Sequence, residues 1–239
     1  MFLYKKRIVV TGGTGRFGNE LKKINSKYTI LFPKKSELNI LKYNNILRYL
    51  KLKKPKYLIN LAGLSRPMEM HETLINKSID LNIIGASNIV KACSELNIKL
   101  IHFSTSYVYP GNKGNYKENN PVLPKNNYAW SKLGGESAVQ MYKNSLILRV
   151  CMTEKPFVHN VAFTDFITNF IFHDDLAKFL LKLINKKGVI NVGGKTQSVF
   201  NFVRKYNPNI KKISAKKILG KKYPLNPSMN INKLKKIIK

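Results

Sequence analysis

Cysteine, acidic side chains and long apolar runs are all scarce in this sequence. Its 239 residues include only two cysteines, Cys93 and Cys151, which excludes a disulfide framework and predicts a reduced, cytoplasmic protein. No apolar run reaches the roughly 18 residues that a membrane-spanning helix needs, so we predict neither a span nor a membrane partner. The apolar stretch near the N-terminus is short and leads into a glycine turn, a pattern that does not fit a signal peptide.

The shortage of acidic residues gives the chain an unusual charge. Only 12 Asp and Glu stand against 43 Lys and Arg, a net charge of +31, which is typical of proteins that bind nucleic acid or anionic surfaces. Only 6 of the basic residues are arginine, the better side chain for phosphates and bases, while asparagine occurs 27 times. We therefore interpret the charge as compositional drift and expect no nucleic-acid partner. The last 64 residues, with 17 Lys or Arg and no acid, remain suited to attracting a phosphorylated substrate.

Short apolar runs alternate with helical patterns along most of the chain. Strands are predicted at residues 8–11, 28–32, 57–61, 100–103, 146–150 and 189–192, and helices at 16–23, 43–52, 72–96, 128–143 and 174–183. This alternation predicts an α/β fold with a Rossmann-like, doubly wound parallel sheet. In the longest helical pattern, apolar residues recur at three- and four-residue steps and predict one buried face, formed by Ile75, Ile79, Ile83, Ala86, Val90 and Cys93.

A glycine-rich turn separates the first predicted strand from the first predicted helix. It reads Thr11-Gly12-Gly13-Thr14-Gly15-Arg16-Phe17-Gly18, with the Gly-x-x-Gly-x-x-Gly spacing of short-chain reductases. Glycine permits a tight turn and lets the backbone approach a pyrophosphate, and the start of a helix offers free N–H groups. We therefore expect residues 12–18 to bind a dinucleotide cofactor.

The end of the second predicted strand bears on which dinucleotide is bound. An acidic residue about 20 positions beyond the turn would bind the adenosine ribose and indicate NAD. Lys34 and Lys35 occupy this region instead, and together with Arg16 they favour the additional phosphate of NADP. We predict NADP(H) as the favoured cofactor, with NAD(H) as the alternative.

The pattern Tyr-x-x-x-Lys occurs three times, about as often as the abundance of lysine gives by chance. The pairs are Tyr49/Lys53, Tyr109/Lys113 and Tyr128/Lys132. The first falls at the wrong end of its helix, and the second spans Pro110-Gly111, which would break a helix. Only Tyr128 and Lys132 lie at the start of a predicted helix, where residues four apart share a face, and follow a strand that ends in Ser104-Thr105-Ser106. We predict Thr105, Tyr128 and Lys132 as the catalytic set.

These residue types suit hydride transfer to a carbonyl carbon. The carbonyl oxygen needs a proton donor, and the reverse reaction needs a base. A free tyrosine has a pKa of about 10, and the Lys132 ammonium with a positive nicotinamide ring would lower it. Lys132 is also expected to hold the nicotinamide ribose and Thr105 to orient the substrate oxygen. Tyr128 and Lys132 are thus predicted to contact the cofactor as well.

Together the motifs resemble the extended short-chain dehydrogenases/reductases that act on nucleotide sugars, most closely the dTDP-4-dehydrorhamnose reductase-like branch. The resemblance is carried by residues 10–18, 59–63, 104–109 and 128–136, and residues 172–177 are similar to a further segment. It implies the Thr105, Tyr128 and Lys132 triad, with Ala62 and Gly63 beside the cofactor and Asn82 supporting them. It also implies a substrate sugar carried on a nucleoside diphosphate, and no catalytic metal.

The chain departs from this family in two places. Members are usually longer, and the shortening falls between Arg149 and Asp174, where substrate contacts normally gather. Asn39 stands where the family often has an aspartate near the adenine, and we retain it as a cofactor contact. We assign residues 1–150 to an NAD(P)-binding Rossmann-like core and 151–239 to a reduced C-terminal substrate or cap region, partly integrated with the core.

Ketone reduction on a nucleotide-linked sugar is the favoured function. Nucleotide-sugar epimerases and dehydratases use the same residues and remain alternatives, as does a non-catalytic NADP-binding regulatory subunit. Arg66 and Ser106 are candidates for substrate contacts, and Trp130 and Tyr107 are expected to serve in packing. The four histidines show no ligand spacing, so no metal site is predicted. The sequence is compatible with a homodimer.

Overall fold

The computed structural model describes residues 5–220 and 223–239 and is built on a six-stranded parallel sheet. The strand order is β10-β5-β4-β3-β1-β2, and every neighbouring pair is parallel. The strands are β1 (Arg7–Thr11), β2 (Thr29–Leu31), β3 (Tyr57–Asn60), β4 (Lys99–Thr105), β5 (Ser145–Val150) and β10 (Gly188–Val192). The predicted Rossmann-like α/β fold is confirmed, and the strand order reverses between β1 and β3, where such folds bind ligands.

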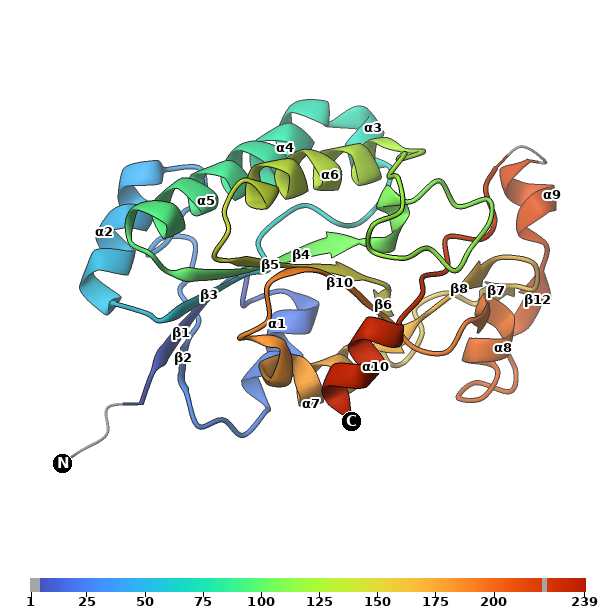
Figure 1. Ribbon diagram of the computed structural model, residues 1–239. Helices are drawn as coiled ribbons and strands as arrows, with labels where there is room; N and C mark the ends of the chain where they lie inside the picture. The colour runs from blue at the N-terminus through green and yellow to red at the C-terminus, as the bar shows by residue number, and fades with distance from the viewer. Residues whose placement is uncertain (1–4, 221–222) are drawn as a thin grey trace.

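Helices cover both faces of the sheet (Figure 1). One face carries α2 (Tyr43–Lys53), α5 (Gly85–Glu95) and α6 (Asn127–Gln140), and the other carries α1 (Arg16–Lys22), α7 (His173–Leu183) and α10 (Asn232–Ile238). Because both faces are buried, the central strands are continuous apolar runs; Ile8, Val9 and Val10 of β1 are all fully buried. The predicted strand and helix at residues 189–192 and 174–183 are confirmed by β10 and α7.

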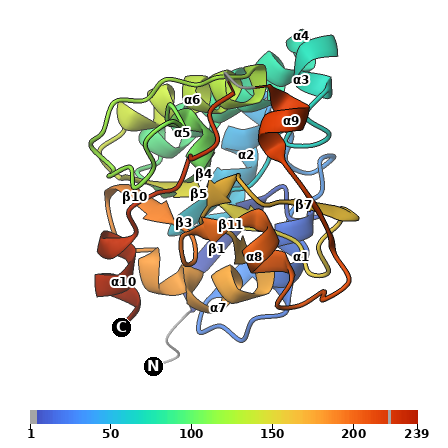
Figure 2. The same cartoon turned by 90° about the vertical axis from the view of Figure 1, so that its right-hand side faces the viewer.

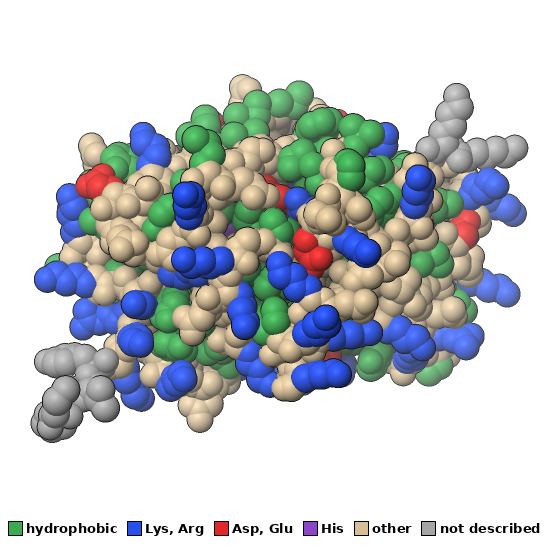
Figure 3. All heavy atoms as spheres, viewed as in Figure 1, with side chains coloured by type: hydrophobic (Ala, Val, Ile, Leu, Met, Phe, Trp, Pro, Cys, Tyr) green, Lys and Arg blue, Asp and Glu red, His purple; other side chains and the backbone are tan. Residues whose placement is uncertain are grey.

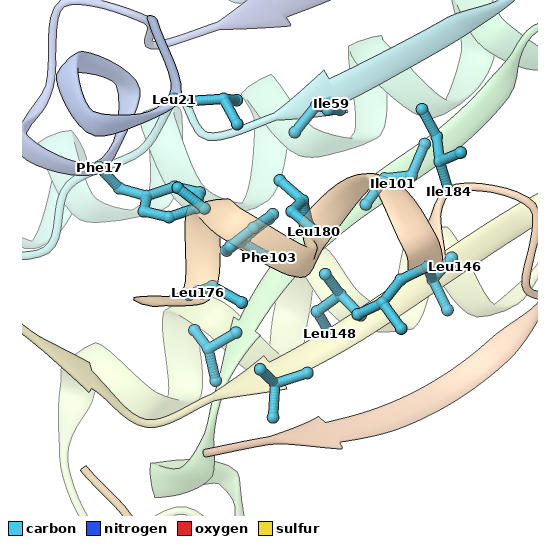
Figure 4. Close-up of a cluster of buried hydrophobic side chains, with 14 of the residues drawn as sticks. Phe17, Leu21, Ile59, Ile101, Phe103, Leu146, Leu148, Leu176, Leu180 and Ile184 are labelled. Carbon is cyan, nitrogen blue, oxygen red and sulfur yellow. The ribbon is translucent and has the colours of Figure 1, made fainter. Parts of the chain in front are cut away.

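A large apolar cluster fills the space between the sheet and α1 and α7. Phe17 from α1 lies 5.2 Å from Phe103 of β4, measured between ring centroids. Figure 4 shows Leu176 and Leu180 of α7 next to the same ring. Phe17 therefore extends into the core beneath the glycine turn rather than toward the ligand side.

The C-terminal part of the chain is divided between the sheet and a small cap. α7, β10 and α10 pack on the core, whereas the cap is formed by short elements around an aromatic cluster that includes Phe166, Phe172 and Phe202. Most of these elements lie together at one end of the sheet in Figure 1, and Figure 2 shows this end facing the viewer. They are β6 (Met152–Thr153), β7 (Val161–Phe163), β8 (Ile167–Thr168), β9 (Ile171–Phe172), β11 (Gln197–Ser198), α8 (Val199–Val203), β12 (Lys211–Ile213) and α9 (Ala215–Leu219).

The single helix predicted over residues 72–96 is wrong. The segment divides into α3 (Met70–Thr73), α4 (Ile75–Ile79), the π-helical turn η1 (Asp80–Ile84) and α5. The backbone leaves the helical region at Leu74, and the wider π turn rotates the faces before and after it against one another. Consequently Ile75 and Ile79, predicted to be buried, are 51% and 39% exposed.

The surface of the molecule is dominated by basic side chains. Figure 3 shows Lys and Arg spread over the visible face, with few Asp or Glu among them. None of the helices in the described part of the chain has the length and apolar character required to span a membrane.

Trp130, expected to serve in packing, is instead 51% exposed, whereas Tyr107 packs against the aromatic cluster of the cap.

Candidate functional site

The structure brings Thr105, Tyr128 and Lys132 together at the carboxyl edge of the sheet. Thr105 is the last residue of β4, and Tyr128 and Lys132 lie one turn apart at the start of α6. That helix begins where predicted because the side chain of Asn126 accepts a hydrogen bond of 2.8 Å from the backbone N–H of Ala129. The Thr105 hydroxyl interacts with the phenol of Tyr128 and lowers its pKa.

The phenol of Tyr128 lies in a confined aromatic environment. Its ring meets the ring of His71 edge-on at 5.0 Å and that of Tyr107 at 6.3 Å, between centroids. Burial raises the pKa of Tyr128, and the hydroxyl of Thr105 and the charge of Arg66 oppose this rise. Burial also lowers the pKa of His71, which favours the neutral ring beside the phenol. Tyr128 is therefore protonated at neutral pH and suited to donate a proton.

The amino group of Lys132 has a lowered pKa. Burial lowers its pKa to about 8, although the carboxylate of Glu136 acts in the opposite direction. No residue in the described part of the chain accepts a hydrogen bond from its Nζ, so the amino group is available to a ligand. Such an amino group fits the hydroxyls of a ribose, the contact predicted from the sequence.

Asn82 in the π-helical turn η1 fixes the position of α6. Its amide donates to the hydroxyl of Ser131 at 2.8 Å and to the carbonyl of Leu64 at 2.9 Å, and its Oδ1 accepts from the Leu64 N–H. A Cβ on Gly63 would lie 2.6 Å from that Oδ1, and one on Gly135 would lie 2.2 Å from the Asn82 carbonyl oxygen. The supporting role predicted for Asn82 follows from these contacts.

The glycine turn packs closely on the loop after β3. Gly12 has a φ of +67°, and a Cβ there would lie 2.6 Å from the backbone nitrogen of Ala62. A Cβ on Gly18 would lie 2.6 Å from the carbonyl oxygen of Gly13, whereas one on Gly15 would meet only the Gly12 oxygen at 3.2 Å. Gly15 and the exposed Thr14 therefore leave backbone open on the ligand side, and the turn fits the pyrophosphate of a dinucleotide.

The predicted adenosine end of the site lies in the loop after β2. Lys34 is exposed, and its backbone N–H donates a 2.7 Å hydrogen bond to the carboxylate of Glu37. The side-chain oxygen of Asn39 accepts from the N–H of Leu41 at 3.0 Å and so stabilises this loop. Residues 34–37 are all exposed, so the amino groups of Lys34 and Lys35 both face solvent.

Three candidate ligand residues have partners that the sequence did not indicate. Arg66 donates to both carboxylate oxygens of Glu154, at 2.9 and 2.8 Å, and Arg16 forms an ion pair with the same carboxylate. The hydroxyl of Ser106, a candidate substrate contact, is 2% exposed and interacts with the thiol of Cys151. Glu154, which directly follows β6, was missed although it is the one acidic residue between Glu136 and Asp165.

Buried polar residues lie behind the site. Thr11 donates to the side-chain oxygen of Asn60 at 2.6 Å, and the amide of Asn60 lies 3.3 Å from Nδ1 of His102. Burial lowers the pKa of His102 well below its usual value, so the ring is a neutral part of the interior. In residues 5–220 and 223–239, no three His, Cys, Asp or Glu side chains gather as metal ligands would.

The fold, the glycine turn and the Thr105, Tyr128 and Lys132 set define an extended short-chain dehydrogenase/reductase. A family model described as RmlD substrate binding domain matches residues 6–163. The chain belongs to this family.

Individual relatives show the extent of the similarity. The dTDP-4-dehydrorhamnose reductase of Aggregatibacter actinomycetemcomitans is 28% identical over 202 residues, which cover 80% of this chain and 63% of the relative. Methionine adenosyltransferase 2 subunit beta of Pongo abelii is 27% identical over 143 residues, 56% of this chain and 42% of the relative. The dTDP-4-dehydrorhamnose reductase of Bacillus anthracis in complex with NADP has a TM-score of 0.86 at 24% identity, covering 97% of this chain and 92% of that one. The matched region thus spans less than two thirds of either curated relative.

Proposed function

We propose that this protein binds NADP(H), with NAD(H) as the weaker alternative, and reduces a ketone on a sugar carried by a nucleoside diphosphate. The observation that carries the proposal is the position of Thr105, Tyr128 and Lys132 at the same carboxyl edge of the sheet as the glycine turn. The relative from Aggregatibacter actinomycetemcomitans bears the name of such a reductase, and the solved structure from Bacillus anthracis contains NADP.

The charges in the site favour reduction as the direction. Burial raises the pKa of Tyr128, so the phenol keeps its proton near neutral pH and acts as an acid toward the substrate oxygen. Thr105, whose hydroxyl already interacts with the phenol, binds the same oxygen and orients the carbonyl. The nicotinamide, when bound, supplies the hydride to the carbonyl carbon.

The remaining residues bind and orient. Lys132 binds the ribose hydroxyls through its free Nζ, which has a pKa of about 8. Gly12, Gly15 and the backbone around them accommodate the pyrophosphate, and Lys34 offers a cation at the adenosine end. One ketone, one NADPH and one proton are consumed, and one alcohol and one NADP⁺ are formed.

The first experiment compares Tyr128→Phe with Tyr49→Phe. Both tyrosines are followed by a lysine four residues later, but Tyr49 lies on α2, away from the carboxyl edge of the sheet. NADPH and NADH are titrated by fluorescence, and cofactor oxidation is followed with a 4-keto nucleotide sugar. We expect Tyr128→Phe to bind cofactor but lose at least about a hundredfold in turnover, with Tyr49→Phe unchanged. Absence of binding of either cofactor to the wild type would contradict the proposal.

A second candidate function is a cofactor-binding regulatory subunit. The similarity to a protein named methionine adenosyltransferase 2 subunit beta favours it, as does the short segment between β5 and α7, which leaves few residues for substrate contacts. Tight NADPH binding without turnover on any 4-keto nucleotide sugar would support this candidate over the reductase. Conversion of such a sugar without net oxidation of NADPH would instead indicate an epimerase or dehydratase.

We further propose that the protein forms a homodimer through the apolar surface of α4, η1 and α6. This surface exposes four large apolar side chains, each between 39% and 51%: Ile75, Ile79, Ile84 and Trp130. Exposed apolar side chains gathered on adjacent helices are typical of a protein–protein contact. Sedimentation velocity on wild type and Ile79→Lys tests this proposal. A wild-type dimer that the substitution converts to a monomer is expected, and a wild-type monomer at micromolar concentration contradicts it.

A further inference from the structure

Three charged side chains from distant parts of the sequence meet next to the glycine turn. Arg16 comes from the glycine turn, Arg66 from the loop after β3, and Glu154 from the residues after β6. Arg66 donates to both oxygens of the Glu154 carboxylate, at 2.9 and 2.8 Å, while Arg16 contacts only Oε1. The contact joins segments that are 138 residues apart in sequence for Arg16 and 88 for Arg66.

This cluster extends from the glycine turn to the catalytic tyrosine. Arg16 immediately follows Gly15, the glycine that leaves the turn open. At the other end, the charge of Arg66 lowers the pKa of Tyr128, so this guanidinium acts on the phenol. A dinucleotide whose pyrophosphate rests on the turn would therefore bring a phosphate group close to Arg16.

The two arginines are not equivalent partners of the carboxylate. The side chain of Arg16 is 50% exposed and has one carboxylate contact, whereas that of Arg66 is 35% exposed and has two. Glu154 itself is only 14% exposed, and the two arginines hold its pKa at about 2, so it is ionised throughout the neutral range. Arg16 is the more exposed of the two partners and lies in the glycine turn, so it is the arginine that a phosphate group of a dinucleotide can reach.

We propose that Glu154 is an internal counter-ion that determines cofactor affinity. It pairs with Arg16 in the cofactor-free protein, and a phosphate group of the dinucleotide replaces it on Arg16 while Arg66 keeps it. The exchange breaks one ion pair and forms another, with no covalent step. This inference rests on the proposed function, since it presupposes that a dinucleotide binds at the glycine turn.

The exchange makes a prediction opposite to that for an ordinary ligand-binding residue. In Glu154→Gln, Arg16 no longer has to leave a carboxylate, and one negative charge is removed from the path of the phosphates. We expect the Kd for NADPH to fall by about two- to fivefold, the range given by releasing one partly exposed ion pair. In Arg16→Gln we expect weaker binding.

The decisive measurement is a double-mutant cycle by fluorescence titration of NADPH. If Glu154 acts through Arg16, then adding Glu154→Gln to Arg16→Gln no longer tightens binding. Glu20→Gln is the matched control, because the Glu20 carboxylate on α1 pairs with Lys23 at 2.8 Å, whereas Arg16 pairs with Glu154. It removes the same charge from the same region, and its Kd is expected to equal that of the wild type. Thermal unfolding without cofactor checks that each variant is folded.

The outcomes separate this inference from the proposed function. Weaker or unchanged NADPH binding in Glu154→Gln, or tightening that persists in the Arg16→Gln background, overturns the counter-ion role and leaves the proposed function intact. Failure of the wild type to bind NADPH or NADH overturns both. If Glu154→Gln and Glu20→Gln tighten NADPH binding equally, the effect comes from the overall charge, and the exchange is likewise overturned.

Discussion

The side-chain amide of Asn82 donates a 2.8 Å hydrogen bond to the hydroxyl of Ser131, which lies between Tyr128 and Lys132 on α6. The same side chain binds both backbone groups of Leu64, in the loop that the glycine turn contacts. One residue therefore sets the position of α6, which carries Tyr128 and Lys132, relative to the loop after β3. The π-helical turn η1 is what presents Asn82 to both partners at once.

Substitution Asn82→Ala should disturb catalysis more than folding. It leaves the polar groups of Leu64 without partners, so the free energy of unfolding should fall by about 1–3 kcal/mol, and displacement of α6 should lower kcat/KM by at least about tenfold. Asn88→Ala is the control, since the Asn88 amide on α5 donates to the carbonyl of Ile40 at 3.0 Å, away from the site. Equal losses of kcat/KM in the two variants would refute the positioning role.

The glycine turn can be tested with two glycines that share a backbone conformation. Gly12 and Gly188 have φ of +67° and +77°, but a Cβ on Gly12 would collide with Ala62, whereas one on Gly188 would have no neighbour within 4 Å. Gly188→Ala should therefore cost about 1 kcal/mol from the positive φ alone. Gly12→Ala should cost more and should also abolish NADPH binding. Urea denaturation and cofactor titration measure both effects, and similar losses in the two variants would mean that the collision is relieved without consequence.

A buried ion pair joins α6 to β5. The Arg149 guanidinium donates to Glu136 at 2.6 Å, and the two side chains are 5% and 1% exposed. Glu136→Gln leaves a buried cation without its counter-charge and should destabilise the protein by about 3–5 kcal/mol. The double substitution Glu136→Leu and Arg149→Met should recover much of this loss, because both charges are then removed. Asp175→Asn, which breaks an exposed pair with Lys178, should change stability by at most about 1 kcal/mol.

Lys132 should give the stability of the protein a distinct pH dependence. Its pKa is about 8 in the folded protein, against an ordinary lysine value of 10.5, so between these values the unfolded chain carries a proton that the folded one has lost. The free energy of unfolding contributed by Lys132 therefore rises with pH in this window, by at most about 1.4 kcal/mol per pH unit. Below about pH 8 the folded state bears a constant penalty for the buried ammonium.

The variant Lys132→Met isolates this contribution. It should be more stable than the wild type at pH 7, with the difference shrinking as the pH rises from about 8 to 10. Lys99→Met serves as a comparison, because burial also lowers the pKa of Lys99 to about 8 and this variant keeps the contribution of Lys132. Urea unfolding at pH 7, 8, 9 and 10 measures the difference in free energy of unfolding between Lys132→Met and the wild type. A difference that does not vary with pH would contradict the prediction.

The sheet and the placement of Thr105, Tyr128 and Lys132 at its carboxyl edge were predictable because each depends on short-range pattern. Continuous apolar runs mark β1, β3, β4 and β5, and the choice of Tyr128 over Tyr49 and Tyr109 needed only the start of a helix and the preceding strand. The small residues of α6 also predict close packing, and Gly135 indeed leaves no room for a Cβ against Asn82.

The residues that escaped prediction depend on contacts between distant segments. Nothing near Glu154 in the sequence indicates that its partners are Arg16 and Arg66, because the crossovers of the sheet bring them together. The exposure of Ile75 and Ile79 follows from the π turn and the break at Leu74, which interrupt a periodicity that looks continuous in the sequence. Hydrophobic spacing alone contains no information about either interruption.

The pairing of β6 with β9 separates the segment whose length this chain can vary from the segments that the core requires. Met152 lies opposite Ile171 and Thr153 opposite Phe172. The segment between the two strands, residues 154–170 (the excursion), therefore begins and ends at adjacent points of the fold. Residues after the excursion supply α7 and the edge strand β10, which the core requires. Within the excursion, β7 and β8 pair with β12 and β11, so we expect insertions or deletions to be tolerated only in its connecting residues, such as 155–159 between β6 and β7.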